Sequence, residues 1–186
     1  RTTVEQWSGY LSGGRSNKHS GVEHESEMKR IARLWVNGDE VEVAVEPSTL
    51  LLDILRESLG LTGTRRGCET SYCGACTVLL DGQTAHSCTI LAALVGERKI
   101  TTIEGLAQGG RLDPLQESFI EHNGFQCGYC TPGMILAGKA LLLANPNPSE
   151  ADVRRAIDGN LCRCTGYQKI VKAIMEGAKK RAADLH

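Results

Sequence analysis

Eight cysteines, arranged as two groups of four, constrain this chain of 186 residues more than any other feature of its sequence. The first group comprises Cys68, Cys73, Cys76 and Cys88. The second group comprises Cys127, Cys130, Cys162 and Cys164. Four thiolates are the usual ligand set of a structural zinc ion or of an iron–sulfur cluster. We therefore predict two four-thiolate sites, named the first site and the second site, with the rest of the chain as their scaffold.

Metal ligation is the favoured role of these cysteines, and disulfides are the less favoured alternative. The N-terminus lacks the charged start and the apolar segment of an export signal. The sequence also contains no apolar run long enough to span a bilayer. We therefore expect a cytoplasmic protein, and in that reducing compartment clustered cysteines bind metal more often than they form disulfides. The formal net charge of -1 gives no electrostatic reason to expect a nucleic-acid partner.

The pattern of apolar residues divides the chain into three segments. Residues 1–29 are predicted to be an N-terminal extension, because one short apolar stripe followed by a Gly/Ser-rich stretch cannot fold alone. We favour a flexible tail there over an arm that docks on a partner subunit. Residues 30–106 are predicted to contain strands and one main helix. Residues 107–186 have a 3.6-residue apolar period, which predicts four helices.

Turn signals locate the elements of the strand-rich segment. Apolar residues alternate with polar ones on both sides of Asn37-Gly38, which is the strongest short-range signal for a β-hairpin. A second hairpin is predicted around Asp81-Gly82. Between them, Ser48-Thr49 precedes an apolar stretch that ends at Gly60, which predicts a helix with a Ser/Thr N-cap. The last strand is predicted over residues 99–103.

Capping pairs locate the four helices of the second half. A helix start is favoured by three local features: a short polar side chain at the N-cap, a proline in the first turn, and an acidic or amide side chain at the third helical position. The predicted starts are Asp113 with Gln116, Thr131 with Pro132, Ser149 with Asp152, and Thr165 with Gln168. Cys130 and Cys164 each precede one of these starts directly. Because a helix N-terminus carries partial positive charge, we expect two N-termini to stabilise the thiolates of the second site.

The first site has the spacing of a plant-type [2Fe–2S] loop. Its first three cysteines, from Cys68 to Cys76, are spaced C-x4-C-x2-C, and Cys88 follows eleven residues later. Structural zinc usually has two short-spaced pairs instead, so zinc is the less favoured alternative. Small residues such as Gly67 and Gly74 are expected to let backbone N–H groups approach the cluster.

The second site consists of two short-spaced pairs, C-x2-C from Cys127 and C-x-C from Cys162. Spacing alone leaves zinc and iron–sulfur open for this site. Its presence beside a ferredoxin-like loop in the same chain favours iron–sulfur, and two clusters in one small chain would form a short wire for single electrons. Arg65 and Arg66 lie beside the first site. They could stabilise added negative charge or guide a partner, but we expect them to be ordinary solvated residues.

Together these motifs resemble the small iron–sulfur subunit of the molybdenum hydroxylases, the relatives of xanthine oxidase, aldehyde oxidoreductase and aerobic carbon monoxide dehydrogenase. The resemblance covers about residues 31–180. Besides the first site, it rests on the stretch from Gln126 to Gly133 and on the stretch from Asn160 to Tyr167. It implies an α+β fold, with a β-grasp plant-type ferredoxin-like domain followed by a four-helix [2Fe–2S]-binding domain.

The resemblance also implies cofactors and partners. All eight cysteines would be ligands of two [2Fe–2S] clusters. A large subunit would carry a molybdopterin-type molybdenum cofactor and a medium subunit FAD, in a dimer of heterotrimers. Gln126 matches the residue that hydrogen-bonds the pyranopterin, and Cys164 matches the ligand whose sulfur approaches the pterin amino group.

The function implied is the transfer of single electrons from molybdenum through both clusters to FAD. No stretch of the chain resembles a flavin-binding or molybdenum-binding domain, so no catalytic residue is expected on it. The chain would be an enzyme only as one subunit of a molybdenum-dependent oxidoreductase. The alternatives are a stand-alone two-cluster electron carrier or redox sensor, and an interaction module held together by zinc.

Overall fold

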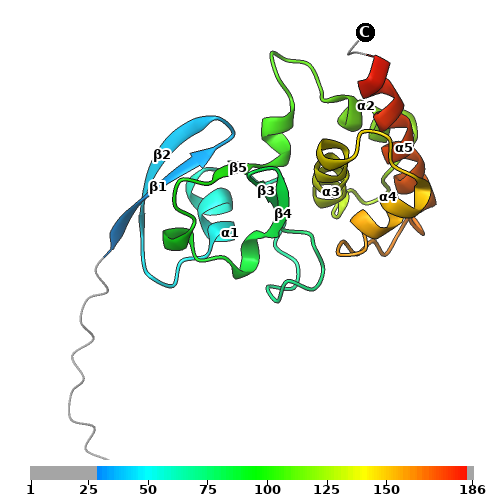
Figure 1. Ribbon diagram of the computed structural model, residues 1–186. Coiled ribbons are helices and arrows are strands. Elements are labelled where there is room, and N and C mark those ends of the chain that lie inside the picture. Colours follow the sequence, from blue (N-terminus) through cyan, green and yellow to red (C-terminus); the bar gives the residue numbers. More distant parts are fainter. Residues whose placement is uncertain (1–28, 184–186) are drawn as a thin grey trace, which may run out of the picture.

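The computed structural model describes residues 29–183, which form a sheet-containing half followed by a helical half (Figure 1). The predicted N-terminal extension, residues 1–29, lies outside the described residues except for Lys29. Within the described part of the chain, no helix is both long enough and apolar enough to cross a membrane.

Five strands form one mixed sheet in the order β2-β1-β5-β3-β4. The strands are β1 (Arg30–Val36), β2 (Asp39–Val45), β3 (Thr77–Leu80), β4 (Gln83–His86) and β5 (Lys99–Thr101). β1 pairs antiparallel with β2 and parallel with β5, while β3 pairs antiparallel with both β5 and β4. Both predicted hairpins are confirmed. They turn at Asn37-Gly38 and Asp81-Gly82, where all four residues have the positive φ that a type I′ turn requires.

The helix after β2 differs from the prediction at its start and in its last turn. α1 (Leu51–Asp53) continues directly into a π-helical turn (Ile54–Ser58). The N-cap is Leu50, whose side chain makes no capping hydrogen bond. The predicted Ser/Thr cap is wrong because the Thr49 hydroxyl accepts the N–H of Glu46 at 3.0 Å instead and stabilises the preceding turn.

The helical half contains the four predicted helices. They are α2 (Pro114–Glu121), α3 (Thr131–Ala144), α4 (Glu150–Ala156) and α5 (Gln168–Ala183). Complete capping boxes are present at the starts of α2 and α4, on the residue pairs predicted. α5 starts later than expected after Thr165, because Gly166 and Tyr167 have φ values of +62° and +68°. Residues with left-handed backbone cannot belong to a right-handed helix.

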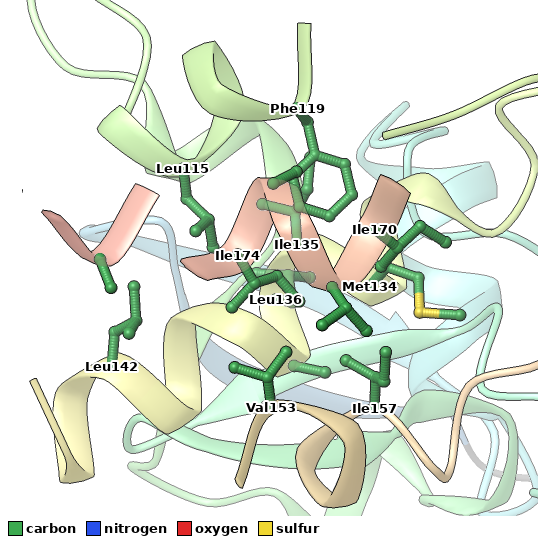
Figure 2. Close-up of a cluster of buried hydrophobic side chains, with 14 of the residues drawn as sticks. Leu115, Phe119, Met134, Ile135, Leu136, Leu142, Val153, Ile157, Ile170 and Ile174 are labelled. Atoms are coloured by element: carbon green, nitrogen blue, oxygen red, sulfur yellow. The ribbon is translucent and has the colours of Figure 1, made fainter. Parts of the chain in front are cut away.

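Each half of the molecule has its own core of buried apolar side chains. In the helical half, side chains from all four helices meet, as Figure 2 shows. They include Leu115 and Phe119 of α2, Met134 and Leu136 of α3, Val153 of α4, and Ile170 and Ile174 of α5. The sheet half packs Leu34, Leu55, Val78 and Ile100. Burying one such side chain contributes about 1.5–3 kcal/mol, so these cores hold the cysteine-bearing loops in place.

Candidate metal centres

The first site lies on the loop that precedes β3 and on the turn that follows β4. Cys68, Cys73 and Cys76 are on the loop, and Cys88 is in the one-turn 3-10 helix Ser87–Thr89. The β3–β4 hairpin returns the chain so that the Ser87 hydroxyl donates to the Cys76 carbonyl at 2.8 Å. Cys76 and Cys88 are both buried and pack together against Leu52. The structure therefore brings the four predicted residues of this site together.

Hydrogen bonding and burial divide the thiols of the first site into an outer and an inner pair. Hydrogen bonds from Thr70, and then from the backbone N–H of Cys73, lower the pKa of Cys68 to about 6. The two backbone N–H groups lie 3.4 and 3.3 Å from the Cys68 sulfur. Burial raises the pKa of Cys76 to about 12, since its side chain is 1% exposed. A metal ligand has to be a thiolate, so a bound cation is what would ionise Cys76.

Gly67 leaves room for this arrangement of thiols. A Cβ at this position would lie 2.6 Å from the Cys73 sulfur, which is closer than atoms can approach. The predicted role of Gly67 agrees with this contact. Gly74 is enclosed differently, because a Cβ there would meet Gly159 and Asn160 of the helical half.

The second site collects thiols from two segments that α3 and α4 separate. Cys127 and Cys130 precede α3, and Cys162 and Cys164 lie on the loop between α4 and α5. The sulfur atoms of Cys127 and Cys164 are 3.5 Å apart. The sulfur of Cys162 also lies 3.0 Å from the Thr165 hydroxyl. The packing of the helical half thus brings these four predicted residues together too.

One helix N-terminus, rather than the predicted two, adjoins the second site directly. Cys130 is the N-cap of α3. Cys164, in contrast, is separated from α5 by a loop that includes Thr165 and Tyr167. The tyrosine hydroxyl of that loop accepts the N–H of Cys162 at 2.9 Å. The prediction of a second helix start directly after Cys164 is therefore wrong, and a side chain holds this half of the site instead.

The second site also has a buried side and an exposed side. Burial raises the pKa of Cys130 to about 12. Cys127 and Cys164 are exposed, and a hydrogen bond from the backbone of Tyr129, followed by one with Cys164, lowers the pKa of Cys127. The hydrogen bond with Cys127 raises the pKa of Cys164. One edge of this site therefore faces outward.

Within each site the thiols interact as pairs. The pairs are Cys68 with Cys73, Cys76 with Cys88, Cys127 with Cys164, and Cys130 with Cys162. Across the described residues, no three Cys, His, Asp or Glu side chains converge as the ligands of one metal ion would. A dinuclear cluster distributes its four thiolates over two irons. The paired arrangement therefore fits a [2Fe–2S] cluster better than a tetrahedral zinc ion.

Gln126 lies at the surface directly before Cys127. Its side chain is exposed, and it makes no hydrogen bond to another of the described residues. Its amide is thus available to a group outside this chain. The predicted contact of Gln126 with a pterin stays a prediction.

Tyr129 connects the two sites, a contact that the sequence did not indicate. Its hydroxyl donates to the carbonyl of Arg66 at 2.5 Å, and the Arg65 guanidinium lies 5.9 Å from the centre of its ring. Arg66 also pairs with Asp53 at 2.5 Å and with Glu69. The expectation of ordinary solvated arginines is therefore wrong. No local pattern signals these contacts, because 63 positions separate Arg66 from Tyr129.

A cavity of about 300 Å³ lies between the two sites. Cysteines of both sites line it, namely Cys68, Cys73, Cys127, Cys130, Cys162 and Cys164. The two sites are therefore neighbours across the contact between the two halves rather than at opposite ends of the molecule.

Comparisons with known proteins match both halves. Residues 34–106 match the family described as 2Fe-2S iron-sulfur cluster binding domain, and residues 102–175 match the family described as [2Fe-2S] binding domain. The nicotinate dehydrogenase small FeS subunit of Eubacterium barkeri is 46% identical over 149 residues, which are 80% of this chain and 95% of that protein. The nicotine 6-hydroxylase small subunit of Paenarthrobacter nicotinovorans is 49% identical over 141 residues, or 76% and 85% of the two chains.

Solved structures agree with these relatives. The crystal structure of quinoline 2-oxidoreductase from Pseudomonas putida 86 superposes with a TM-score of 0.81 at 45% identity, over 85% of this chain and 98% of that chain. The predicted α+β fold, a ferredoxin-like domain followed by a helical [2Fe–2S]-binding domain, is thereby confirmed. This chain therefore belongs to the small iron–sulfur subunits of the molybdenum hydroxylase family and is a subunit of an oxidoreductase.

Proposed function

We propose that this chain transfers electrons within a heteromeric molybdenum hydroxylase and holds one [2Fe–2S] cluster at each site. The proposed ligands are Cys68, Cys73, Cys76 and Cys88 at the first site, and Cys127, Cys130, Cys162 and Cys164 at the second. When bound, each cluster takes up and releases one electron at a time. The partners would be a large subunit with a molybdopterin-type molybdenum cofactor and a medium subunit with FAD. The names of the two relatives, which are small subunits of a dehydrogenase and of a hydroxylase, support partner chains.

A single hydrogen bond between the two halves carries this proposal. The N–H of Leu161 donates to the carbonyl of Cys73 at 2.9 Å. Cys73 belongs to the first site, and Leu161 directly precedes Cys162 of the second site. The two sites are thus connected by a few covalent bonds and one hydrogen bond. Two independent structural metal ions would not need such a link, whereas the passage of single electrons between clusters would benefit from it.

The surface at the second site supports the proposed direction of electron flow. Cys127 and Cys164 are exposed there, beside the exposed amide of Gln126. An amide side chain offers both a donor and an acceptor, which suits the polar edge of a pterin. We propose that Gln126 hydrogen-bonds the pyranopterin and that the Cys164 sulfur approaches its amino group. Electrons would then leave toward FAD from the first site.

The proposal also includes the domain organisation and the setting of the protein. Residues 30–106 and 107–186 would be the two cluster-binding domains, and residues 1–29 an extension. The assembly would be a dimer of heterotrimers. Eight free thiols are compatible with a reducing compartment, and on that ground we propose a cytoplasmic location.

The experiment that tests this function is purification of the chain with its partners, followed by reduction with substrate. We expect about four irons and four sulfides per chain, and two distinct paramagnetic signals after reduction. Purification from the native host in a complex without molybdenum and flavin would overturn the assignment in favour of a stand-alone carrier or redox sensor.

The Gln126→Ala variant tests the proposed contact with the molybdenum cofactor. Both clusters should remain, while cofactor retention or the steady-state rate falls by roughly tenfold or more, as is typical when an outer-shell contact to a metal group is lost. Gln83→Ala is the matched control, because Gln83 is also exposed but lies on β4. An unchanged rate and cofactor content in Gln126→Ala would contradict the proposed contact.

A further inference from the structure

A buried junction holds the two halves together beside the sites, and it consists of Asn160, Gly74, Thr77 and Gly133. Asn160 is 4% exposed. Its Nδ2 donates to the carbonyl of Gly74 at 2.8 Å and to the Thr77 hydroxyl oxygen at 3.1 Å. The Thr77 hydroxyl donates to the same carbonyl at 2.6 Å. The backbone N–H of Thr77 also donates to this carbonyl, at 3.1 Å. Both hydrogens of the amide are therefore used, and three donors converge on the Gly74 carbonyl, which fixes the geometry of these groups.

The glycines of the junction allow the two halves to approach this closely. A Cβ on Gly74 would lie 2.3 Å from the Gly159 carbonyl oxygen and 2.7 Å from the Asn160 Nδ2. A Cβ on Gly133, in the first turn of α3, would lie 2.6 Å from the Gly74 carbonyl oxygen and 2.8 Å from the same Nδ2. Gly74 also has a φ of +69°, which favours glycine. No side chain larger than hydrogen fits at either position without moving the junction.

The junction adjoins the hydrogen bond that links the sites. Gly74 directly follows Cys73, whose carbonyl accepts that bond. Asn160 directly precedes Leu161, whose N–H donates it. Holding Asn160 on Gly74 therefore holds the Leu161 N–H on the Cys73 carbonyl, and it also fixes where the next residue, Cys162, lies relative to the first site.

We propose that Asn160 is a positioning residue for electron transfer between the two sites. Through the junction it sets the separation and orientation of the two clusters and keeps the link between Leu161 and Cys73 aligned. The proposal rests on the proposed function. With both clusters bound, the step concerned would move one electron from a reduced cluster held by the second site to an oxidised cluster held by the first, and no bond of the protein chain would form or break. Asn160 acts through its neighbours, since it is not one of the proposed ligands.

The Asn160→Ala variant tests this role in the full chain, co-expressed with its partners and with both clusters assembled. Iron and sulfide content should equal those of the wild type. The spin–spin interaction between the two chemically reduced clusters, measured by electron paramagnetic resonance, should weaken. The rate of electron transfer between the clusters should fall on the order of tenfold or more, because small misplacements of reacting groups cost up to about 100-fold.

Two further variants complete the experiment. Asn147→Ala is the control, since this asparagine lies on the loop between α3 and α4 and should leave every readout unchanged. Thr77→Val retains the shape of the side chain but removes one acceptor of the Asn160 amide and one donor to the Gly74 carbonyl. It should give the same changes to a smaller extent, because the bond from Asn160 to Gly74 remains. A wild-type interaction and transfer rate in Asn160→Ala overturns the proposal. If Asn160→Ala loses a cluster, Thr77→Val replaces it in the test. A wild-type spin–spin interaction and transfer rate in Thr77→Val then overturns the proposal.

The chemical reductant separates this inference from the proposed function. Reduction with dithionite needs neither substrate nor partner cofactors, so the spin–spin interaction reports the positions of the clusters alone. A wild-type complex whose clusters substrate does not reduce would count against the proposed function only. A junction variant with unchanged coupling would count against the role of Asn160 only.

Discussion

The first and second sites contain the same number of thiols but depend on different levels of structure. Three thiols of the first site come from one loop, and the β3–β4 hairpin returns the fourth. The second site draws two thiols from each of two segments, which come together only when α3 and α4 pack. The first site is thus largely a local property of the chain. The second site exists only if the helical core forms.

The two sites also differ in how far they face outward. Cys76 and Cys88 are buried within the sheet half, whereas Cys127 and Cys164 of the second site are exposed. Exposed thiols are where a partner's redox group can come close. The comparison therefore favours the proposed contact of the second site with a partner cofactor and leaves the first site as the more enclosed of the two.

Cysteine replacement should have the largest effect and tests whether the two sites are independent. Cys164→Ser removes an exposed proposed ligand, and we expect the second cluster to be lost while the first remains. Cys76→Ser removes a buried proposed ligand and should eliminate the first cluster. Iron analysis and the spectrum of the reduced protein measure both outcomes. An unaltered reduced spectrum in Cys164→Ser would refute its role as a ligand.

Truncation in the two cores should have the next largest effect. Phe119 is 1% exposed in the helical core, and Phe119→Ala should lower the free energy of unfolding by about 3–5 kcal/mol. Leu34 is fully buried in the sheet core, and Leu34→Ala should cost about 2–5 kcal/mol. On heating, Phe119→Ala should lose the second cluster at a lower temperature than the wild type. Leu34→Ala should instead lose the first cluster at a lower temperature. Loss of both clusters at one temperature in both variants would show that the two halves unfold as a unit.

The smallest effect is expected from Tyr129→Phe, which modifies the contact between the sites. The hydroxyl bond to Arg66 is lost, while the ring remains beside the Arg65 guanidinium. Because the bond is neutral and accessible to water, its loss should cost about 0.5–1.5 kcal/mol. Denaturant unfolding measures this change. Tyr129→Ala, which removes the ring contact as well, should cost more, and equal values for the two variants would mean that the ring contributes nothing.

Local signals in the sequence predicted most of the fold. The Asn37-Gly38 turn and the capping box of Asp113 with Gln116 depend on residues close together in the chain, so their local chemistry is sufficient. The wrong predictions of helix starts concern hydroxyls with two available partners. The Thr49 hydroxyl accepts a hydrogen bond from the N–H of Glu46, in the turn before its helix. The Thr165 hydroxyl accepts the N–H of Tyr167 and lies close to the Cys162 sulfur, so neither hydroxyl caps a helix. Propensity does not decide between such partners, whereas the path of the surrounding chain does.

The sequence by itself determined that this chain has two groups of four cysteines, a ferredoxin-like loop and a helical half, because spacing and periodicity are local properties. Only the tertiary structure decided how the sites meet. The contacts of Asn160 with Gly74 and of Tyr129 with Arg66 span more than sixty positions and use groups that carry no pattern of their own. Such contacts result from the packing of one half on the other, which depends on the shapes of both folded halves.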